Sequence, residues 1–491
     1  MLFNSYEYIF LFLPVVVAVY FALNRRRLVA AGKAWLVLAS LFFYSYWNIR
    51  YLPLLLLSIL VNYAVGTALA TTRRQRAPWE ALVPPRLVLA AGICFNVGLL
   101  GYFKYTDFFL DNLNRALGLH LPLPHIALPL AISFFTFQQI AFLVDSYRGE
   151  TAEYDFLDYC LFVSFFPQLI AGPIVHHGEM MPQFSRIRNK LPNHRNIAIG
   201  LAFFAMGLFK KAVIADTLSE WATQGFDTAP VLNLAEAWTA SLAYTFQLYY
   251  DFSGYTDMAM GAAYLFNIRL PLNFNSPYKA GNIRDFWRRW HMTLTRWLRD
   301  YLYIPMGGNR RGVLRGYVNL VVTFFLVGLW HGAGWTYVLW GTLHGLGSAV
   351  HRLWRNAGLR MPTWIGWPLT FLFVHCTWVV FRARNLHDAA KVFKGMLGMT
   401  GVVLPAELAP ALGRLAELGV RFGETFDWVK GNARALAILA LVAAMAFAAR
   451  NSVAVARELR PDWKSAAFVT ALLVLGVLHL SQMSEFLYFI F

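Results

Sequence analysis

Long apolar stretches recur along the whole chain and are separated by short polar or basic segments. Runs of roughly 17 to 22 apolar residues have the length that a helix needs to cross a bilayer. We therefore predict apolar helices at 8–23, 34–47, 51–70, 87–103, 197–214, 234–250, 258–268, 317–330, 335–350, 368–381, 435–449 and 465–480. The pattern indicates one all-α, polytopic membrane domain over residues 1–491, with roughly ten to twelve crossings.

Two further apolar segments are too short and polar for an ordinary span. Residues 156–170 end just before a helix-breaking Gly-Pro pair, and residues 129–144 carry Ser133, Thr136, Gln138 and Gln139. We expect re-entrant or buried interior helices here, which would leave a thin waist at the centre of the protein.

Charged residues interrupt three other regions. We expect Lys210 and Lys211 to mark a helix end near an interface. Asp251 and Asp257 flank a Ser-Gly-Tyr turn. They could act as acid and base, but their spacing fixes no geometry, so we favour capping of a broken helix or pairing with arginines. Residues 404–430 are amphipathic, and we expect them to lie at an interface.

Basic clusters predict the orientation of the chain. Arginines follow the first span at 25–27 and the third at 73, 74 and 76, which assigns those loops to the cytoplasm. We therefore expect the first segment to be an uncleaved anchor with its N-terminus outside. Nine Lys or Arg and only two Asp lie between residues 279 and 315, and this region belongs on the same side.

The composition supports a membrane protein over a soluble one. The chain is 58% hydrophobic and 14% charged, whereas soluble proteins average about 25% charged residues. Its net charge of +17 would indicate nucleic acid in a soluble protein, but here it fits cytoplasmic loops, and we predict no nucleic-acid partner. The three cysteines are widely spaced in apolar surroundings and indicate neither disulfides nor a zinc site.

His331 is the main catalytic candidate. It lies near the end of an apolar helix, where an ionisable side chain is costly and therefore a functional candidate. Gly332 and Gly334 remove bulk beside it, so that another chain or a ligand could approach. A neutral imidazole is suited to take a proton from a hydroxyl that attacks an acyl carbonyl. A core histidine hydrogen-bonded between helices would show the same pattern.

His291 lies in the basic region, where helical spacing would place Trp287, His291 and Leu294 on one face. Taken alone, His291 is more typical of an interfacial residue that anchors the helix. Arg288, Arg289 and Arg310 are the nearby candidates for phosphate binding, because guanidinium groups match the geometry of a phosphate. A loop attracted to anionic lipid is the simpler alternative.

A metal site receives little support. His176 and His177 precede Glu179, but two adjacent histidines do not converge on one face of a helix. The chain also lacks the metal, nucleophile-elbow and phosphate-loop motifs of soluble enzymes. We predict no metal.

Several motifs together resemble the membrane-bound O-acyltransferases, and within them the bacterial branch that O-acetylates alginate, peptidoglycan and cellulose. The matching segments are FWRRWH at 286–291, WLRDYLYIPMGGN at 297–309 and WHGA at 330–333. Further likeness lies in MLFNS at 1–5, FPQLIAGP at 166–173 and DFSGYTD at 251–257. The resemblance therefore extends over nearly the whole chain.

This resemblance implies about eleven transmembrane helices plus re-entrant helices around a central funnel, in the bacterial inner membrane. The implied activity is transfer of acetyl from cytoplasmic acetyl-CoA towards an extracytoplasmic polysaccharide, completed by an extracytoplasmic partner protein. His331 and His291 match the two characteristic histidines of the family, with His331 the catalytic one. A basic cytoplasmic mouth formed by Arg288, Arg289 and Arg310 would bind coenzyme A.

Two other functions remain open. One is transfer of D-alanine or another acyl group by the same fold, and the other is a non-enzymatic lipid or polymer flippase. The sequence does not specify which polysaccharide accepts the acyl group. The apolar C-terminal segment 486–491 resembles a Tyr-bearing motif of cell-surface acylation systems, which implies that Tyr488 accepts acetyl as a relay. An aromatic anchor at the membrane interface is the alternative.

Overall fold

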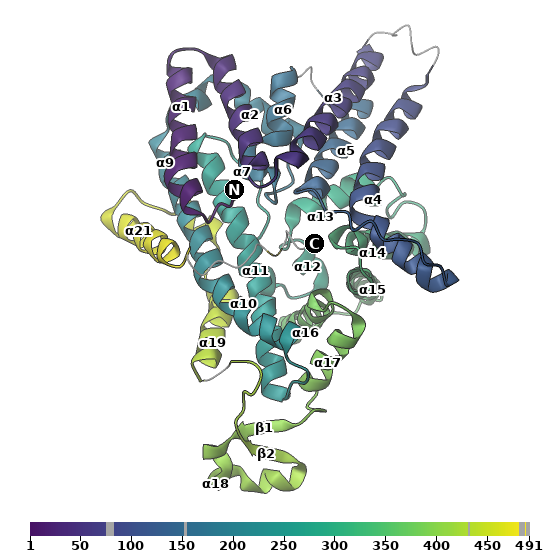
Figure 1. Cartoon of the computed structure of the whole chain (residues 1–491), viewed down its shortest axis with the longest axis vertical. Helices are drawn as coiled ribbons and strands as arrows, with labels where there is room; N and C mark the ends of the chain where they lie inside the picture. The colour runs from purple at the N-terminus through teal and green to yellow at the C-terminus, as the bar shows by residue number, and fades with distance from the viewer. Residues whose placement is uncertain (75–82, 152–154, 431–432, 481–486, 488–491) are drawn as a thin grey trace.

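The computed structural model is almost entirely helical (Figure 1). It describes residues 1–74, 83–151, 155–430, 433–480 and 487. The N-terminal half contains α1 Leu13–Arg25, α2 Val29–Ser45, α3 Leu52–Arg74, α4 Pro85–Leu117, α5 Ile132–Arg148, α6 Phe156–Ser164, α7 Phe166–Leu169, α8 His177–Ser185, α9 His194–Leu208 and α10 Asp216–Thr223. The C-terminal half contains α11 Leu234–Leu265, α12 Ile283–Trp287, α13 Met292–Leu298, α14 Val313–His331, α15 Trp335–Asn356, α16 Thr363–Arg382, α17 Leu386–Met396, α18 Ala409–Leu412, α19 Ala433–Ala448, α20 Ser452–Arg457 and α21 Trp463–Leu478.

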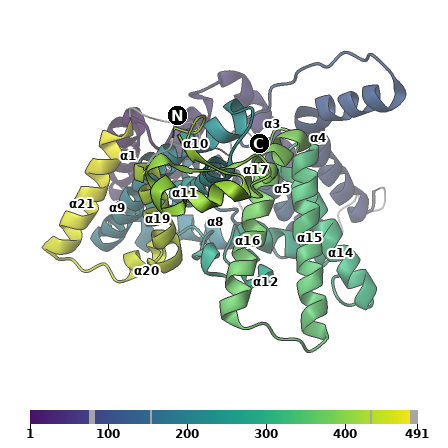
Figure 2. The same ribbon diagram turned by 90° about the horizontal axis from the view of Figure 1, so that it is seen from below.

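Short π- and 3-10-helical segments extend several of these helices. They are η1 Glu7–Phe12, η2 Ile49–Tyr51, η4 Ile187–Lys190, η5 Phe209–Ala215, η6 Gln224–Thr228, η7 Pro277–Lys279, η8 Arg299–Tyr303, η9 Ala406–Leu408 and η10 Gly413–Leu418. Seen from below, α14, α15 and α16 form one side of the protein, and α9, α19 and α21 form the other (Figure 2).

Six helical stretches of the described chain are long and apolar enough to cross a membrane. They are Glu7–Arg25, Ile49–Ala70, Pro85–Leu117, His194–Thr228, Val313–His331 and Thr363–Arg382. Three shorter apolar helices are Val29–Ser45, Arg434–Ala448 and Trp463–Leu478. The predicted polytopic helical architecture is therefore present.

The long helix α11 lies at the centre of the helical bundle and is buried along almost its whole length. The expected break between Asp251 and Asp257 is wrong, because α11 runs without interruption through both carboxylates. It packs closely on α9 through glycines: a Cβ added to Gly207 would lie 2.5 Å from the carbonyl oxygen of Gly254. Such small residues allow two helix backbones to approach in a membrane protein.

Buried ion pairs explain why the helices continue. The Lys211 ammonium lies 2.8 Å from a carboxylate oxygen of Asp216 and 2.8 Å from one of Asp251. Lys210 lies 2.7 Å from Asp257. The expected helix end at Lys210 and Lys211 is therefore wrong, as is the expected pairing of the aspartates with arginines. Pairing offsets the cost of burying each charge.

The two short polar segments form interior helices. In α5 every side chain from Ile132 to Leu143 is buried, and α6 and α7 are buried almost throughout. The expectation of a buried interior helix at 129–144 is confirmed.

Residues 404–430 contain a small sheet, and their expected position at an interface stays a prediction. Strand β1 Val402–Pro405 pairs in parallel with β2 Val420–Gly423, and short helical turns lie between them. This small sheet and α18 lie beyond the end of the helical bundle in Figure 1. A small two-stranded sheet with short helical turns therefore occupies this segment.

Candidate active site

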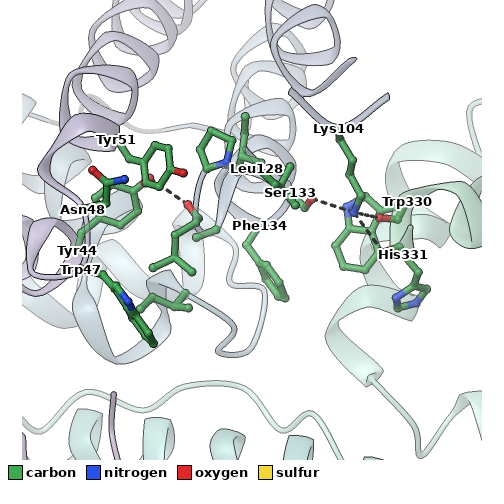
Figure 3. A pocket seen from close by; sticks show the side chains of 15 residues that line it. Tyr44, Trp47, Asn48, Tyr51, Lys104, Leu128, Ser133, Phe134, Trp330 and His331 are labelled. Atoms are coloured by element: carbon green, nitrogen blue, oxygen red, sulfur yellow. Dashed lines mark hydrogen bonds between the residues drawn. The ribbon is translucent and has the colours of Figure 1, made fainter. Parts of the chain in front are cut away.

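His331 lies at the last position of α14, at the wall of a cavity of about 320 Å³. Its side chain is only 4% exposed. Helices α2 and α4, the start of α5 and the end of α14 contribute to this cavity (Figure 3). The lining residues near His331 are Lys104, Ser133, Phe134 and Trp330.

Aromatic rings fix the position of the imidazole. The ring of Trp340 lies 5.0 Å from that of His331, edge-on, and Phe381 lies 5.4 Å away. The ring of Trp330 lies 4.9 Å away. These contacts leave the imidazole little rotational freedom and shield it from water, which strengthens electrostatic interactions in the site.

Two residues of α4 hold the end of the helix that carries His331. The Lys104 ammonium donates hydrogen bonds to the carbonyl oxygens of Trp330 at 2.5 Å and His331 at 3.2 Å. The Tyr105 hydroxyl donates to the Leu329 carbonyl at 2.7 Å. The last carbonyls of a helix have no partner within it, and a cation there is favoured by the helix dipole.

Sequence reasoning missed Lys104. The signal that could have found it is a lysine at the far end of a long apolar helix, where it needs an internal partner.

Gly332 does not open space for a ligand as expected, because Tyr337 of the same chain packs against it. A Cβ on Gly332 would lie 2.2 Å from the Tyr337 ring, and that of Gly334 would lie 3.4 Å from it. The space that Gly332 leaves is therefore filled by Tyr337 of the same chain and is not open to a ligand. Helices α14 and α15 also meet closely, because a Cβ on Gly341 would lie 2.3 Å from the Phe324 carbonyl oxygen.

His291 lies behind Trp330, in the interior of the protein. Its side chain is 0% exposed, and Nδ1 lies 3.1 Å from Oδ1 of Asn273. The Trp330 ring lies 6.4 Å from His291 and 4.9 Å from His331, so it contacts both imidazoles. The structure therefore brings the two predicted histidines to the same region.

The predicted continuous helix around His291 is wrong. α12 ends at Trp287 and α13 begins at Met292, and His291 has a left-handed backbone with φ 43°. Asn273 explains this conformation, because its side-chain oxygen also accepts hydrogen bonds from the backbone N–H and hydroxyl of Thr293. His291 is therefore buried and is not an interfacial anchor.

The three arginines predicted to bind coenzyme A differ in their surroundings. Arg288 is exposed and Arg289 is bound by Asp285, with Nε 3.0 Å from both carboxylate oxygens. Arg310 is exposed in the loop before α14. A guanidinium cluster nevertheless exists around Arg284, whose pKa is lowered by burial and by the nearby Arg288, Arg355 and Arg352.

His176 and His177 belong to a hydrogen-bond network. His177 Nε2 lies 3.1 Å from Asp145, the Tyr301 hydroxyl donates to Asp145 at 2.7 Å, and His176 Nδ1 lies 3.1 Å from that hydroxyl. Burial, and then the nearby Arg296, lower the pKa of His176. In the described part of the chain, no three His, Cys, Asp or Glu side chains are grouped as metal ligands would be.

The predicted relay Tyr488 lies outside the described residues. Its neighbour Leu487 is described and is buried, and its backbone N–H donates to Asp251 Oδ2 at 3.0 Å. Leu487 is therefore tied to the central helix α11. Asp251 in turn binds Lys211, whose ammonium nitrogen lies 2.8 Å from the other carboxylate oxygen.

Comparison with known proteins identifies the family. The sequence profile of the membrane-bound O-acyltransferases (MBOAT) matches residues 41–386, more than half of the chain. The chain belongs to the MBOAT family. It is an acyltransferase by this membership, and the family's membrane location agrees with its apolar helices.

Relatives narrow the comparison within the MBOAT family. The chain is 46% identical to the peptidoglycan O-acetyltransferase of Helicobacter pylori, over 100% of this chain and 98% of that protein. It is 40% identical to the probable alginate O-acetylase AlgI of Pseudomonas aeruginosa, over 81% and 75% of the two chains. It is 26% identical to the teichoic acid D-alanyltransferase of Bacillus subtilis, over 55% and 72%.

Proposed function

We propose that this MBOAT enzyme transfers acetyl from cytoplasmic acetyl-CoA across the bacterial inner membrane for O-acetylation of an extracytoplasmic polysaccharide. All 491 residues would form one catalytic membrane domain. The observation that carries the proposal is a buried imidazole, His331, at the wall of a cavity within the helical bundle. The names of the O-acetyltransferase relatives supply the acyl group and the class of acceptor.

The cavity is suited to the acceptor side of the reaction. It is lined by residues from the loop between α2 and α3, such as Trp47 and Asn48, and from the segment Leu128–Ser133 before and within α5. The positive-inside rule assigns both loops to the extracytoplasmic side. A hydroxyl acceptor would therefore reach His331 from outside.

The arginine side is suited to the donor. The cluster of Arg284 and Arg288 with Arg352 and Arg355 belongs to the predicted cytoplasmic face. Guanidinium groups bind phosphates in a bidentate manner, and coenzyme A carries several phosphates. Arg288 would contribute most directly, Arg310 would add charge at the rim, and Arg289 would act through its pairing with Asp285.

The chemistry assigned to His331 is general base catalysis. The imidazole takes the proton of the acceptor hydroxyl while the hydroxyl oxygen attacks the thioester carbonyl carbon. The carbon–sulfur bond breaks, the imidazolium returns the proton to the sulfur, and free coenzyme A leaves. His291 would keep the shared tryptophan, Trp330, in place beside His331.

Tyr488 is proposed as the first acceptor. Its phenol oxygen would receive acetyl, and the aryl ester would pass it to the polymer with an extracytoplasmic partner protein. The hydrogen bond between Leu487 and Asp251 supports this, because it brings the chain next to Tyr488 into the protein core. A peripheral anchor would not need such a bond.

Transfer of D-alanine is the second candidate, on the strength of the weaker likeness to teichoic acid D-alanyltransferases. Purified protein in nanodiscs, incubated with radiolabelled acetyl-CoA or with D-alanine on a carrier protein, separates the two. Label transferred from acetyl-CoA alone supports the proposal. Label from the carrier alone replaces it with D-alanyl transfer, and label from neither favours a flippase.

A further inference from the structure

A second cavity, of about 750 Å³, is strongly basic. It lies among the segment 183–196, the first turns of α9, the end of α11 with the following loop, and α20. Five arginines line it, namely Arg186, Arg188, Arg195, Arg269 and Arg457. Among the described residues that line it, none is Asp or Glu. An unbalanced group of guanidinium side chains favours an anionic ligand.

Hydrogen bonds give the cavity a defined shape. The buried Asn267 side chain donates to the carbonyls of Asn189 at 3.0 Å and Leu191 at 2.8 Å, and accepts from Asn196 at 2.9 Å. The Arg269 backbone and the Gln183 side chain bond each other in both directions. The arginine-bearing segment is therefore fixed to the end of α11.

The charges at the start of α9 point to an anion. This helix begins with His194 and Arg195 and has no acidic residue in its first turn. Its N-terminus already carries a partial positive charge, so a cation there is unfavourable unless an anion neutralises both. Asn193 caps only the N–H of Asn196.

Part of the cavity lining is apolar. It is formed by Phe203 and Ile199 of α9, Met260 of α11, and Leu270 and Leu272. α9 is part of a candidate membrane span, His194–Thr228. A ligand that fits must combine phosphate groups with an apolar part.

We propose that this cavity binds an anionic phospholipid, with its phosphates on the arginines and the start of its acyl chains on Phe203 and Met260. The positive-inside rule assigns this arginine-rich segment to the cytoplasmic side, where basic pockets between membrane helices are suited to such headgroups. A lipid with two phosphates would use the five positive charges best. This site shares no lining residue with the cavity at His331, so the proposal does not depend on acetyl transfer.

Native mass spectrometry of the detergent-purified full chain tests the site. The probes are cardiolipin, phosphatidylglycerol, phosphatidylcholine and coenzyme A. The test variant is Arg188→Gln/Arg195→Gln, and the matched control is Arg115→Gln/Arg414→Gln, which removes the same charge from exposed positions elsewhere. Loss of two arginine contacts should weaken cardiolipin binding about tenfold or more in the test variant, and the control should bind like the wild type.

Each other outcome overturns the proposal. Equal cardiolipin binding by wild type and test variant would remove the arginines from lipid recognition. Equal retention of phosphatidylcholine would reduce the site to general lipid contact. If the variant loses coenzyme A binding and keeps cardiolipin binding, the cavity belongs to the acyl donor. Unfolding temperatures of both double variants, measured without added lipid, check that neither is misfolded.

Discussion

The ammonium group of Lys104 lies 3.2 Å from the carbonyl oxygen of His331, although the two residues are 227 positions apart in the sequence. It also lies 2.5 Å from the Trp330 carbonyl oxygen. One side chain of α4 thus binds the last two carbonyls of the helix that presents the candidate catalytic imidazole. The orientation of His331 therefore depends on α4 as well as on its own helix.

Lys104→Met tests this dependence. The change leaves two carbonyl oxygens without their donor, and a buried unsatisfied group costs about 1–3 kcal/mol. We expect a lower unfolding temperature and a fall in kcat for acetyl transfer, with the KM for acetyl-CoA unchanged, because the variant shifts the imidazole and leaves the donor surface intact. Lys464→Met, at an exposed residue, is the control. A variant with wild-type kcat would show that Lys104 does not position His331.

His331→Ala should abolish acetyl transfer without loss of folding. A general base contributes about 10²- to 10⁴-fold to the rate, so the rate should fall by a factor in this range, or below the detection limit. His375→Gln is a matched control, because His375 is also buried but is hydrogen-bonded to Ser241 and Thr245 within the bundle. Rates are measured with radiolabelled acetyl-CoA. Near wild-type activity of His331→Ala would remove this residue from the mechanism.

Neutralising Arg288, Arg289 and Arg310 should raise the KM for acetyl-CoA more than it lowers kcat. The exposed guanidinium groups are screened by salt, so the KM of the wild type should rise with ionic strength. The KM of the variant should rise less. Isothermal titration with coenzyme A gives the affinity directly. Arg414→Gln, on the β1–β2 segment, serves as the control. Unchanged affinity would make the cluster a signal of topology only.

Tyr488→Phe should stop polymer acetylation and leave the unfolding temperature unchanged. The substitution removes one hydroxyl and retains the backbone that follows Leu487. Mass spectrometry of the C-terminal peptide after treatment with acetyl-CoA should show acetyl on Tyr488. Tyr102→Phe, which changes an exposed tyrosine of α4, is the control. A fully active Tyr488→Phe enzyme would reject the relay.

Lys211→Met should strongly destabilise the protein. It leaves the buried carboxylates of Asp216 and Asp251 without their shared cation, and breaking such a pair costs about 3–5 kcal/mol. Chemical denaturation in detergent measures the effect. The triple variant Lys211→Met/Asp216→Asn/Asp251→Asn should recover part of the loss, since it leaves no unpaired charge. Equal stability of Lys211→Met and wild type would contradict this account.

The sequence by itself determined the helical membrane architecture, the interior position of residues 129–144 and the location of His331 at a helix end. Apolar run length and local motifs report these features directly, because each depends on residues close together in the chain. The family resemblance rested on the same local motifs.

Only the tertiary structure decided how distant residues are paired. Lys211 has the sequence pattern of a helix end, yet it is buried because Asp216 and Asp251 both neutralise it, and Asp251 lies 40 residues away. His291 lies between two helices because Asn273 fixes its turn, and Lys104 caps the helix of His331 from α4. A charge can be buried, or a backbone bent, only where a partner stabilises it. When folding brings that partner from a distant segment, the hydrophobic periodicity of neither segment reveals the pairing.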